Sequence, residues 1–151
     1  MNQSSFPNLT LRPPRSPRVR LGGYVILARM LDKGRAALAG QAGEYKFNSP
    51  MDQHWLRFTG ISAEALKVEL ALGKGDGEIL ASIQEHASHK REAWEIQQWS
   101  AYFNERGPDS DADTLEFFVN GVSRFSQVRE DIKTWFDLLD LDDHVSFSGL
   151  P

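Results

Sequence analysis

The sequence predicts an all-α protein, a compact bundle of six or seven short helices with an extended N-terminal arm and at most a small two-stranded β element. Three observations favour this class. Apolar side chains recur at the spacing of a helix face in several segments. Short runs of Gly, Pro, Ser or Asp separate these segments and are typical of helix starts and stops. The 151 residues, of which 40% are hydrophobic, suffice for one buried core.

Residues 1–17 predict an extended arm rather than a helix. This segment holds four of the seven prolines and no helical apolar pattern. Each proline fixes its own φ and biases the preceding residue toward extended backbone. We therefore expect two parts: a Pro- and Arg-rich arm over residues 1–17 and a single helical domain over residues 18–151.

The first helix is predicted over residues 23–38 and is expected to end near Gly40. Its apolar stripe consists of Leu27, Met30, Leu31 and Leu38. Residues 44–47 then alternate polar and aromatic side chains, which predicts a short strand, and residues 145–147 are its expected partner. A strand pair of this size is marginal alone and would have to lie on the helices.

Helices in the middle of the chain are predicted from their capping residues. A short helix follows Pro50, and Ser62 is a good N-cap for the next one. Asp76 is expected to cap a further helix. Ser88 is expected to cap a longer one that runs to about Arg106. The connections between these segments are short, as in helical bundles.

Two more helices are predicted near the C-terminus. Asp113 and Glu116 have the spacing of a capping box and mark the start of the first. The last shows the clearest helical stripe in the chain, formed by Val128, Ile132, Trp135, Phe136 and Leu139.

Composition excludes several classes of function. The chain has no Cys, which removes disulfides, thiolate metal sites and cysteine nucleophiles. The formal net charge of −4 is unfavourable for nucleic-acid binding. No stretch is apolar enough for a membrane span or a signal peptide, so we expect a cytoplasmic protein. No cofactor motif is present. His86 and His89 lie on either side of the predicted cap at Ser88, so we expect no metal site.

Charge is spread unevenly along the chain. Residues 1–40 carry seven basic side chains and one acidic one, whereas residues 41–151 carry ten basic and twenty acidic ones. The basic cluster is Arg12, Arg15, Arg18 and Arg20, and the acidic cluster is Asp137, Asp140, Asp142 and Asp143. The arm could pair with the acidic cluster as a structural clamp, remain solvated, or present arginine forks to a phosphate or carboxylate. For the last case the ligand-binding candidates are Arg18 and Arg20.

One segment mixes polar and aromatic groups densely enough to suggest chemistry. His54 has a side chain suited to proton transfer near neutral pH, and Asp52 could serve as its carboxylate partner. Tyr45 lies in the same segment and completes the catalytic candidates. The alternative is structural: Asp52 caps a helix and His54 is half-buried with a satisfied hydrogen bond.

Aromatic residues on more than one side of the predicted helix that follows Ser88 suggest a contact surface. Ile96, Trp99 and Phe103 share one stripe, whereas Trp94 and Tyr102 fall off it. Burial on both sides would explain this pattern, and so would a dimer or ligand interface through Trp94 and Tyr102, because aromatic side chains are enriched in interfaces. We therefore consider a homodimer.

Three blocks of the sequence resemble a bacterial family known as domain of unknown function 5069. They are SPRVRLGGYVILARMLDKGRAALAG, GEYKFNSPMDQHWLRFTGI and WFDLLDLDDHVSF, and the similarity spans about residues 11–147. The resemblance implies a small, stand-alone, all-α bacterial protein and assigns no activity, cofactor or catalytic residue.

Two functions remain open from the sequence. The first, which we favour because no catalytic motif is present, is a binding or interaction module for a protein partner or a small anionic ligand. The alternative is a small enzyme. There, Arg18 or Arg20 would hold an anion while His54 and Asp52 move a proton.

Overall fold

The computed structural model describes residues 6–109 and 111–151, and within these residues it contains seven α-helices and no strand. The all-α prediction is therefore confirmed. The helices are α1 (Leu27–Leu38), α2 (Pro50–Thr59), α3 (Ala63–Ala71), α4 (Asp76–His86), α5 (Ala93–Glu105), α6 (Ala112–Ser123) and α7 (Trp135–Ser146).

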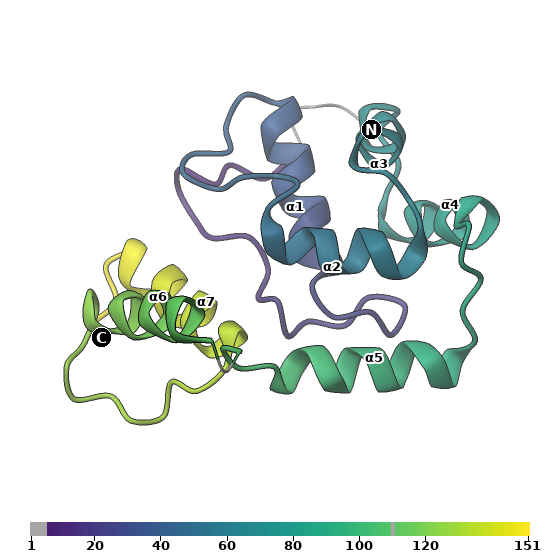
Figure 1. The fold of residues 1–151 in the computed structure, drawn as a ribbon. Coiled ribbons are helices and arrows are strands. Elements are labelled where there is room, and N and C mark those ends of the chain that lie inside the picture. Colours follow the sequence, from purple (N-terminus) through teal and green to yellow (C-terminus); the bar gives the residue numbers. More distant parts are fainter. Residues whose placement is uncertain (1–5, 110) are drawn as a thin grey trace.

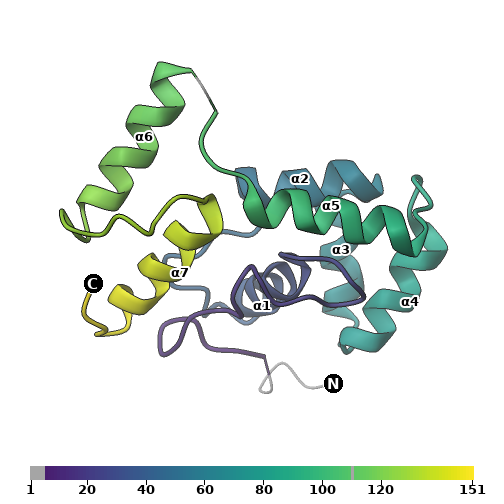
Figure 2. The ribbon, with the colours of Figure 1, turned by 90° about the horizontal axis from the view of Figure 1, so that it is seen from below.

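Helix α1 is the centre of the fold. It lies among α2, α3, α5 and α7, and nine of its twelve residues are buried (Figures 1 and 2). Every helix except α6 contributes to the core around it. The largest core side chains from these other helices are Trp55, Leu70, Ile79, Phe103 and Phe136. Gly34 allows close packing between α1 and α3, because a Cβ there would meet Leu70 at 2.6 Å.

Helices α6 and α7 lie side by side at one end of the molecule, and Figure 2 shows α6 standing away from the helices around α1. Phe118 is the one buried residue of α6. Its ring packs edge-on against Trp135 of α7, with 5.1 Å between the ring centroids. This arrangement leaves space between α6, α7 and the start of α2, and that space positions the site described below.

The first helix begins at Leu27, four residues later than predicted. Gly22 and Gly23 both have positive φ, which a right-handed helix does not allow, and Leu21 and Tyr24 form an isolated bridge around them. Ile26 also has a φ of 65°, which is rare for a β-branched residue. The buried residues before α1 are therefore a tight loop, although their apolar pattern continues that of the helix.

The expected strand pair does not form. Residues 44–47 form a turn and connecting backbone, in which Tyr45 N–H donates to Ala42 O at 3.1 Å. Val145 and Ser146 are the last residues of α7, and Phe147 is its C-cap. The predicted last helix is also shorter than its stripe, because α7 starts only after the N-cap Thr134. Val128, which was assigned to that stripe, is 86% exposed.

Three predicted caps are displaced by a few residues. Glu92 rather than Ser88 caps α5, because Ser88 is held in the preceding loop, where its hydroxyl donates to Gly60 O at 3.2 Å. Gly75 rather than Asp76 is the N-cap of α4. Asp111 rather than Asp113 caps α6, accepting from Thr114 N–H at 2.9 Å. Ser62 caps α3 as predicted, and α2 begins at Pro50 with Ser49 as its N-cap and Asp52 as the reciprocal partner. The existence of all these helices agrees with the prediction.

The N-terminal segment packs on the helices. From residue 6 to residue 17 it has neither helix nor strand, but the predicted extended arm is not confirmed, because residues 9–11 form a turn in which Leu11 N–H donates to Asn8 O at 3.2 Å. Phe6 and Leu9 are buried, and Leu9 N–H donates to Gln41 O at 2.9 Å. Residues 1–5 of the predicted arm lie outside the described residues.

Candidate functional site

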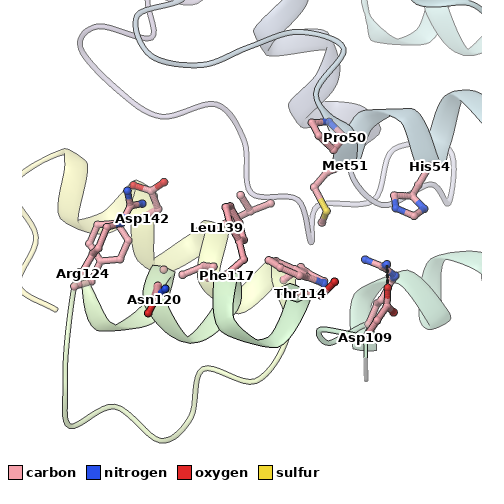
Figure 3. A pocket seen from close by; sticks show the side chains of 15 residues that line it. Pro50, Met51, His54, Asp109, Thr114, Phe117, Asn120, Arg124, Leu139 and Asp142 are labelled. Atoms are coloured by element: carbon pink, nitrogen blue, oxygen red, sulfur yellow. Dashed lines mark hydrogen bonds and ion pairs between the residues drawn. The ribbon is translucent and has the colours of Figure 1, made fainter. Parts of the chain in front are cut away.

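A cavity of about 630 Å³ lies between the start of α2, the end of α5, α6 and α7 (Figure 3). Its walls are mainly apolar, as in most small-molecule sites. We call it the α6–α7 cavity. It is lined by Pro50, Met51, His54, Arg106, Asp109, Thr114, Phe117, Asn120, Gly121, Arg124, Phe125, Trp135, Leu138, Leu139 and Asp142.

Local capping interactions position the α2 and α7 walls. Ser49 and Asp52 form a reciprocal capping box at the start of α2, with Pro50 as its first residue, so His54 lies just beyond the first turn. Thr134 forms the equivalent box at the start of α7. Trp135 N–H also donates to Arg106 O at 3.1 Å, which joins the end of α5 to the start of α7.

Two hydrogen-bonding side chains, His54 and Arg106, lie close to each other in the lining of the cavity. His54 is half-buried, with its ring edge-on to Phe103 at 5.1 Å between centroids. Burial lowers the pKa of His54, and the positive charges of Arg106 and Arg57 lower it further, so the imidazole is neutral at neutral pH. Arg106 pairs with Asp109 at 3.4 Å. Trp135 Nε1 is buried and has no hydrogen-bond partner within the described residues.

The opposite end is also charged. Figure 3 shows Arg124 and Asp142 there, with Phe117 and Leu139 between them and the His54 end. The Arg124 guanidinium lies 5.3 Å from the centroid of the Phe125 ring. The cavity thus combines an apolar middle with polar groups at both ends, which suits a ligand that is itself amphipathic.

A second cavity of about 570 Å³ adjoins the first and shares Met51, Leu139 and Asp142 with it. Three of its lining residues, Arg29, Lys33 and Asp52, belong to a group of buried charges that also includes Asp143. Lys33 Nζ lies 2.8 and 2.9 Å from the two carboxylate oxygens of Asp52. Arg29 pairs with Asp143 through both of its terminal nitrogens, at 2.7 and 3.1 Å. We call this group of four residues the buried charge cluster.

The buried charge cluster is satisfied internally. Lys33 has three ammonium protons and three acceptors, the two Asp52 oxygens and Ser49 Oγ. Tyr45 donates its hydroxyl to Asp143 at 2.8 Å, and burial together with that carboxylate raises the pKa of the phenol. Burial lowers the pKa of Lys33, an effect that Asp52 opposes. Because these groups bind one another, the geometry indicates a structural role, in which the two ion pairs connect α1 to α2 and α1 to α7.

The N-terminal arginines have separate partners. Arg18 contacts Asp137, and it also pairs with Asp140 at 3.1 Å, which is the clamp that the charge pattern suggested. Arg15 bridges Asp32 and Asp76 at 3.0 and 2.8 Å. Arg20 is exposed and forms no ion pair with any described residue.

The structure does not bring the predicted site residues together. His54 opens onto the α6–α7 cavity, whereas Asp52 and Tyr45 line the adjoining one, and Asp52 binds Lys33 rather than His54. Arg18 and Arg20 line neither cavity. Asp52 and His54 point in different directions because each residue of an α-helix turns by about 100° around the axis, so residues two apart lie on opposite sides.

The predicted interface residues lie on the exposed side of α5. Trp94 is 56% exposed and Tyr102 is 59% exposed. Trp94 Nε1 donates to Glu92 at 2.9 Å. The stripe residues Trp99 and Phe103 face the opposite way and pack with Phe58 and Phe136 respectively.

Sequence reasoning missed Arg106 and Trp135, which line the same cavity as His54 only in the folded chain. Arg106 was treated as the end of a helix and Trp135 as a core position. It also missed Arg29 and Lys33, although their i, i+4 spacing within an apolar helix was a signal that two cations share a buried face. Within residues 6–109 and 111–151, no group of three or more potential metal ligands is found. In the same ranges, no helix is both long and apolar enough to cross a membrane.

Comparison with known proteins gives a family and no function. No curated protein is significantly similar to the chain. The model of one family, described as a domain of unknown function, DUF5069, matches residues 11–145. This range includes α1 to α6 and nearly all of α7, together with the whole lining of the α6–α7 cavity and the buried charge cluster. Because the match covers most of its length, the chain belongs to the DUF5069 family.

Proposed function

We propose that the protein binds a small amphipathic anion, a molecule with an apolar body and a carboxylate, in the α6–α7 cavity. The observation that carries this proposal is a mainly apolar cavity of about 630 Å³ whose lining includes the neighbouring side chains of Arg106 and His54. An apolar body would be held by burial against Met51, Leu138 and Leu139, and the donors would orient the polar group.

The anionic group is inferred from Arg106. Its side chain is 18% exposed, and its partner Asp109 is 61% exposed at a distance of 3.4 Å. An ion pair at that distance with one exposed partner is weak, so a carboxylate on the ligand can compete for the guanidinium. The neutral imidazole of His54 supplies a further donor to the same ligand.

Binding is better supported than catalysis. An acid–base pair would need a carboxylate that orients the His54 ring. The nearest polar partner of His54 Nδ1 is instead Arg57 Nη2, at 3.5 Å. A cation beside the ring favours the neutral form and gives the imidazole no proton acceptor of its own.

Thermal unfolding with matched probes tests the proposal. We would use octanoate and 3-phenylpropionate, with octanol and 3-phenylpropanol as uncharged counterparts. A ligand at about a hundredfold its Kd adds about 2.7 kcal/mol, which corresponds to a Tm increase of about 5–10 °C for a domain of this size. The acids are expected to raise Tm and the alcohols to have little effect.

Two variants and one NMR measurement localise the binding. Arg106→Gln is expected to abolish the Tm increase caused by the acids. Arg57 is an exposed arginine beside His54 that does not line the cavity, so Arg57→Gln is expected to keep that increase. A bound carboxylate should also raise the pKa of His54 in an NMR titration, because it favours the imidazolium. Equal stabilisation by acids and alcohols would contradict the anionic part of the proposal, and no stabilisation by any probe would contradict the binding function.

A protein partner is a second proposal, supported by the exposed Trp94 and Tyr102 of α5. Large aromatic side chains with more than half of their surface in water are the residue types that interfaces favour. A homodimer through this face is tested in the Discussion.

A further inference from the structure

A third cavity, of about 620 Å³, lies on another part of the molecule and shares no lining residue with the two described above. It lies between the N-terminal segment, α1 and the start of α4. Three of its lining residues are arginines. The full lining is Pro7, Arg12, Pro13, Arg15, Asp32, Arg35, Gly75 and Asp76.

The lining carries more positive than negative charge. Its three guanidinium groups face two carboxylates, Asp32 and Asp76. Burial alone would raise the pKa of Asp76, yet hydrogen bonds from Arg15 and Arg35 hold it below its usual value. Asp76 therefore stays ionised and is already neutralised by its two arginine partners, which leaves the charge of Arg12 uncompensated.

The two carboxylates orient Arg15 and Arg35 without using all of their donors. Arg15 bridges Asp32 and Asp76, and Arg35 donates to Asp76 at 2.8 Å and to Lys74 O at 3.1 Å. Arg35 is only 7% exposed, and its Nε has no hydrogen-bond partner within the described residues. A guanidinium presents several N–H groups in a rigid fork, so both arginines have protons left for an acceptor.

Arg12 is the accessible member of the group. It is exposed and makes no hydrogen bond or ion pair with any residue of the described ranges. Proline at position 13 restricts its backbone, so its side chain starts from a defined point at the cavity rim. A long, unpaired cation beside two fixed ones is an arrangement that favours an anion with several acceptor oxygens.

The start of α4 adds backbone donors to the lining of the cavity. Its N-cap is Gly75, which has no side chain to accept from the first-turn N–H groups. Glu78 turns back only to Gly75 N–H, at 3.2 Å. Backbone N–H groups and the positive end of the helix dipole therefore lie beside the three arginines.

We propose that this cavity is a binding site for a phosphate group, held by Arg12, Arg15 and Arg35 and by the first backbone N–H groups of α4. Arg15 and Arg35 are held in place before the ligand arrives, and Arg12 closes on it. A phosphate has the charge to match the uncompensated guanidinium and enough oxygens to accept from several forks at once. The same chemistry is presented by inorganic phosphate and by a phosphate monoester.

Isothermal titration calorimetry with the whole chain tests the site. The probes are inorganic phosphate and glycerol 3-phosphate, in chloride buffer at constant ionic strength. We expect Arg12→Gln to weaken phosphate binding about tenfold or more, because a charge-assisted contact is lost. Arg20→Gln, which removes an equally exposed and unpaired arginine outside the cavity, is expected to leave the affinity unchanged.

A second measurement places the ligand. The backbone amide signals of Gly75, Asp76 and Gly77 should shift on addition of phosphate and should not shift with chloride. Tighter binding of the monoester or of inorganic phosphate identifies the source of the group, and either result supports the site. Absence of binding at millimolar phosphate, or equal affinity in Arg12→Gln and the parent protein, would overturn it. Neither probe tests the α6–α7 cavity, so the two proposals fail independently.

Discussion

Replacing Lys33 with Met should be among the most destabilising single changes in this protein. The substitution keeps the side-chain length and removes the charge that neutralises Asp52, a residue with no exposed surface. Breaking a buried ion pair from one side costs about 3–5 kcal/mol, because the remaining charge stays in a poor solvent. That is a large part of the roughly 5–15 kcal/mol by which domains are stable. The corresponding fall in Tm is about 6–20 °C.

The double variant Lys33→Met, Asp52→Leu separates charge burial from packing. With both charges gone no ion is stranded, and replacing a whole buried pair by apolar residues is often neutral or stabilising by about 1–4 kcal/mol. Asp52 also accepts from Ser49 N–H in the α2 capping box, and that loss costs about 1 kcal/mol. We therefore expect the double variant to be clearly more stable than Lys33→Met alone.

Urea unfolding followed by tryptophan fluorescence and by circular dichroism measures these effects. A lower midpoint at unchanged slope reports a change in stability rather than in the compactness of either state. Lys46→Met is the matched control, because Lys46 is exposed and lines the same 570 Å³ cavity as Lys33. This substitution should change the free energy of unfolding by less than about 0.5 kcal/mol. A Lys33→Met protein within about 1 kcal/mol of the parent, or a double variant that loses the sum of the single effects, would refute the reasoning.

Three further predictions use other parts of the structure. The folded protein holds the pKa of His54 below its usual 6.5, so the unfolded chain binds the proton first, and the free energy of unfolding should fall as pH drops below about 6.5. Urea midpoints of the parent protein and of His54→Gln at several pH values measure this effect. Identical pH profiles for the two proteins would contradict it. Thr134→Ala removes the hydroxyl that accepts from Asp137 N–H at 3.0 Å and should destabilise by about 1 kcal/mol in the same assay, whereas no change would count against this cap. If the exposed face of α5 forms a homodimer, sedimentation velocity should show a dimer for the parent protein and a monomer for the double variant Trp94→Ala/Tyr102→Ala. A parent protein that is monomeric at high concentration would exclude this interface.

Helix number and type could be predicted from the sequence because capping residues and apolar spacing act locally. Ser62, for example, begins α3 through a hydrogen bond that its side chain accepts from Ala65 N–H, three residues along the chain. Helix starts were harder to predict where two local signals compete. The apolar residues from Tyr24 to Ile26 continue the stripe of α1, yet they form a loop because two glycines before them adopt positive φ. The predicted start of the last helix was also too early, because Val128 matches the helical spacing but lies before α7 and is 86% exposed.

The candidate site was less accessible from the sequence because its parts meet only through tertiary contacts. His54 was singled out for its chemistry. Arg106 and Trp135 line the same cavity, and a hydrogen bond between them links the end of α5 to the start of α7. Asp52 is two residues from His54 in sequence and faces Lys33 instead. Whether two nearby polar residues form a pair depends on the helix face that each occupies and on what packs against it.

The weak attachment of α6 has a consequence for how the α6–α7 cavity fills and empties. Phe118 is the single buried side chain of that helix, while Phe117 and Val119 are 70% and 57% exposed. Segments with few buried contacts open locally at a small fraction of the global unfolding free energy. Hydrogen exchange should therefore be fast throughout α6 and slow in α1, where nine of twelve residues are buried. One wall of the cavity can then move without disturbing the rest of the molecule, so ligand entry and release would be governed by the opening of a single helix.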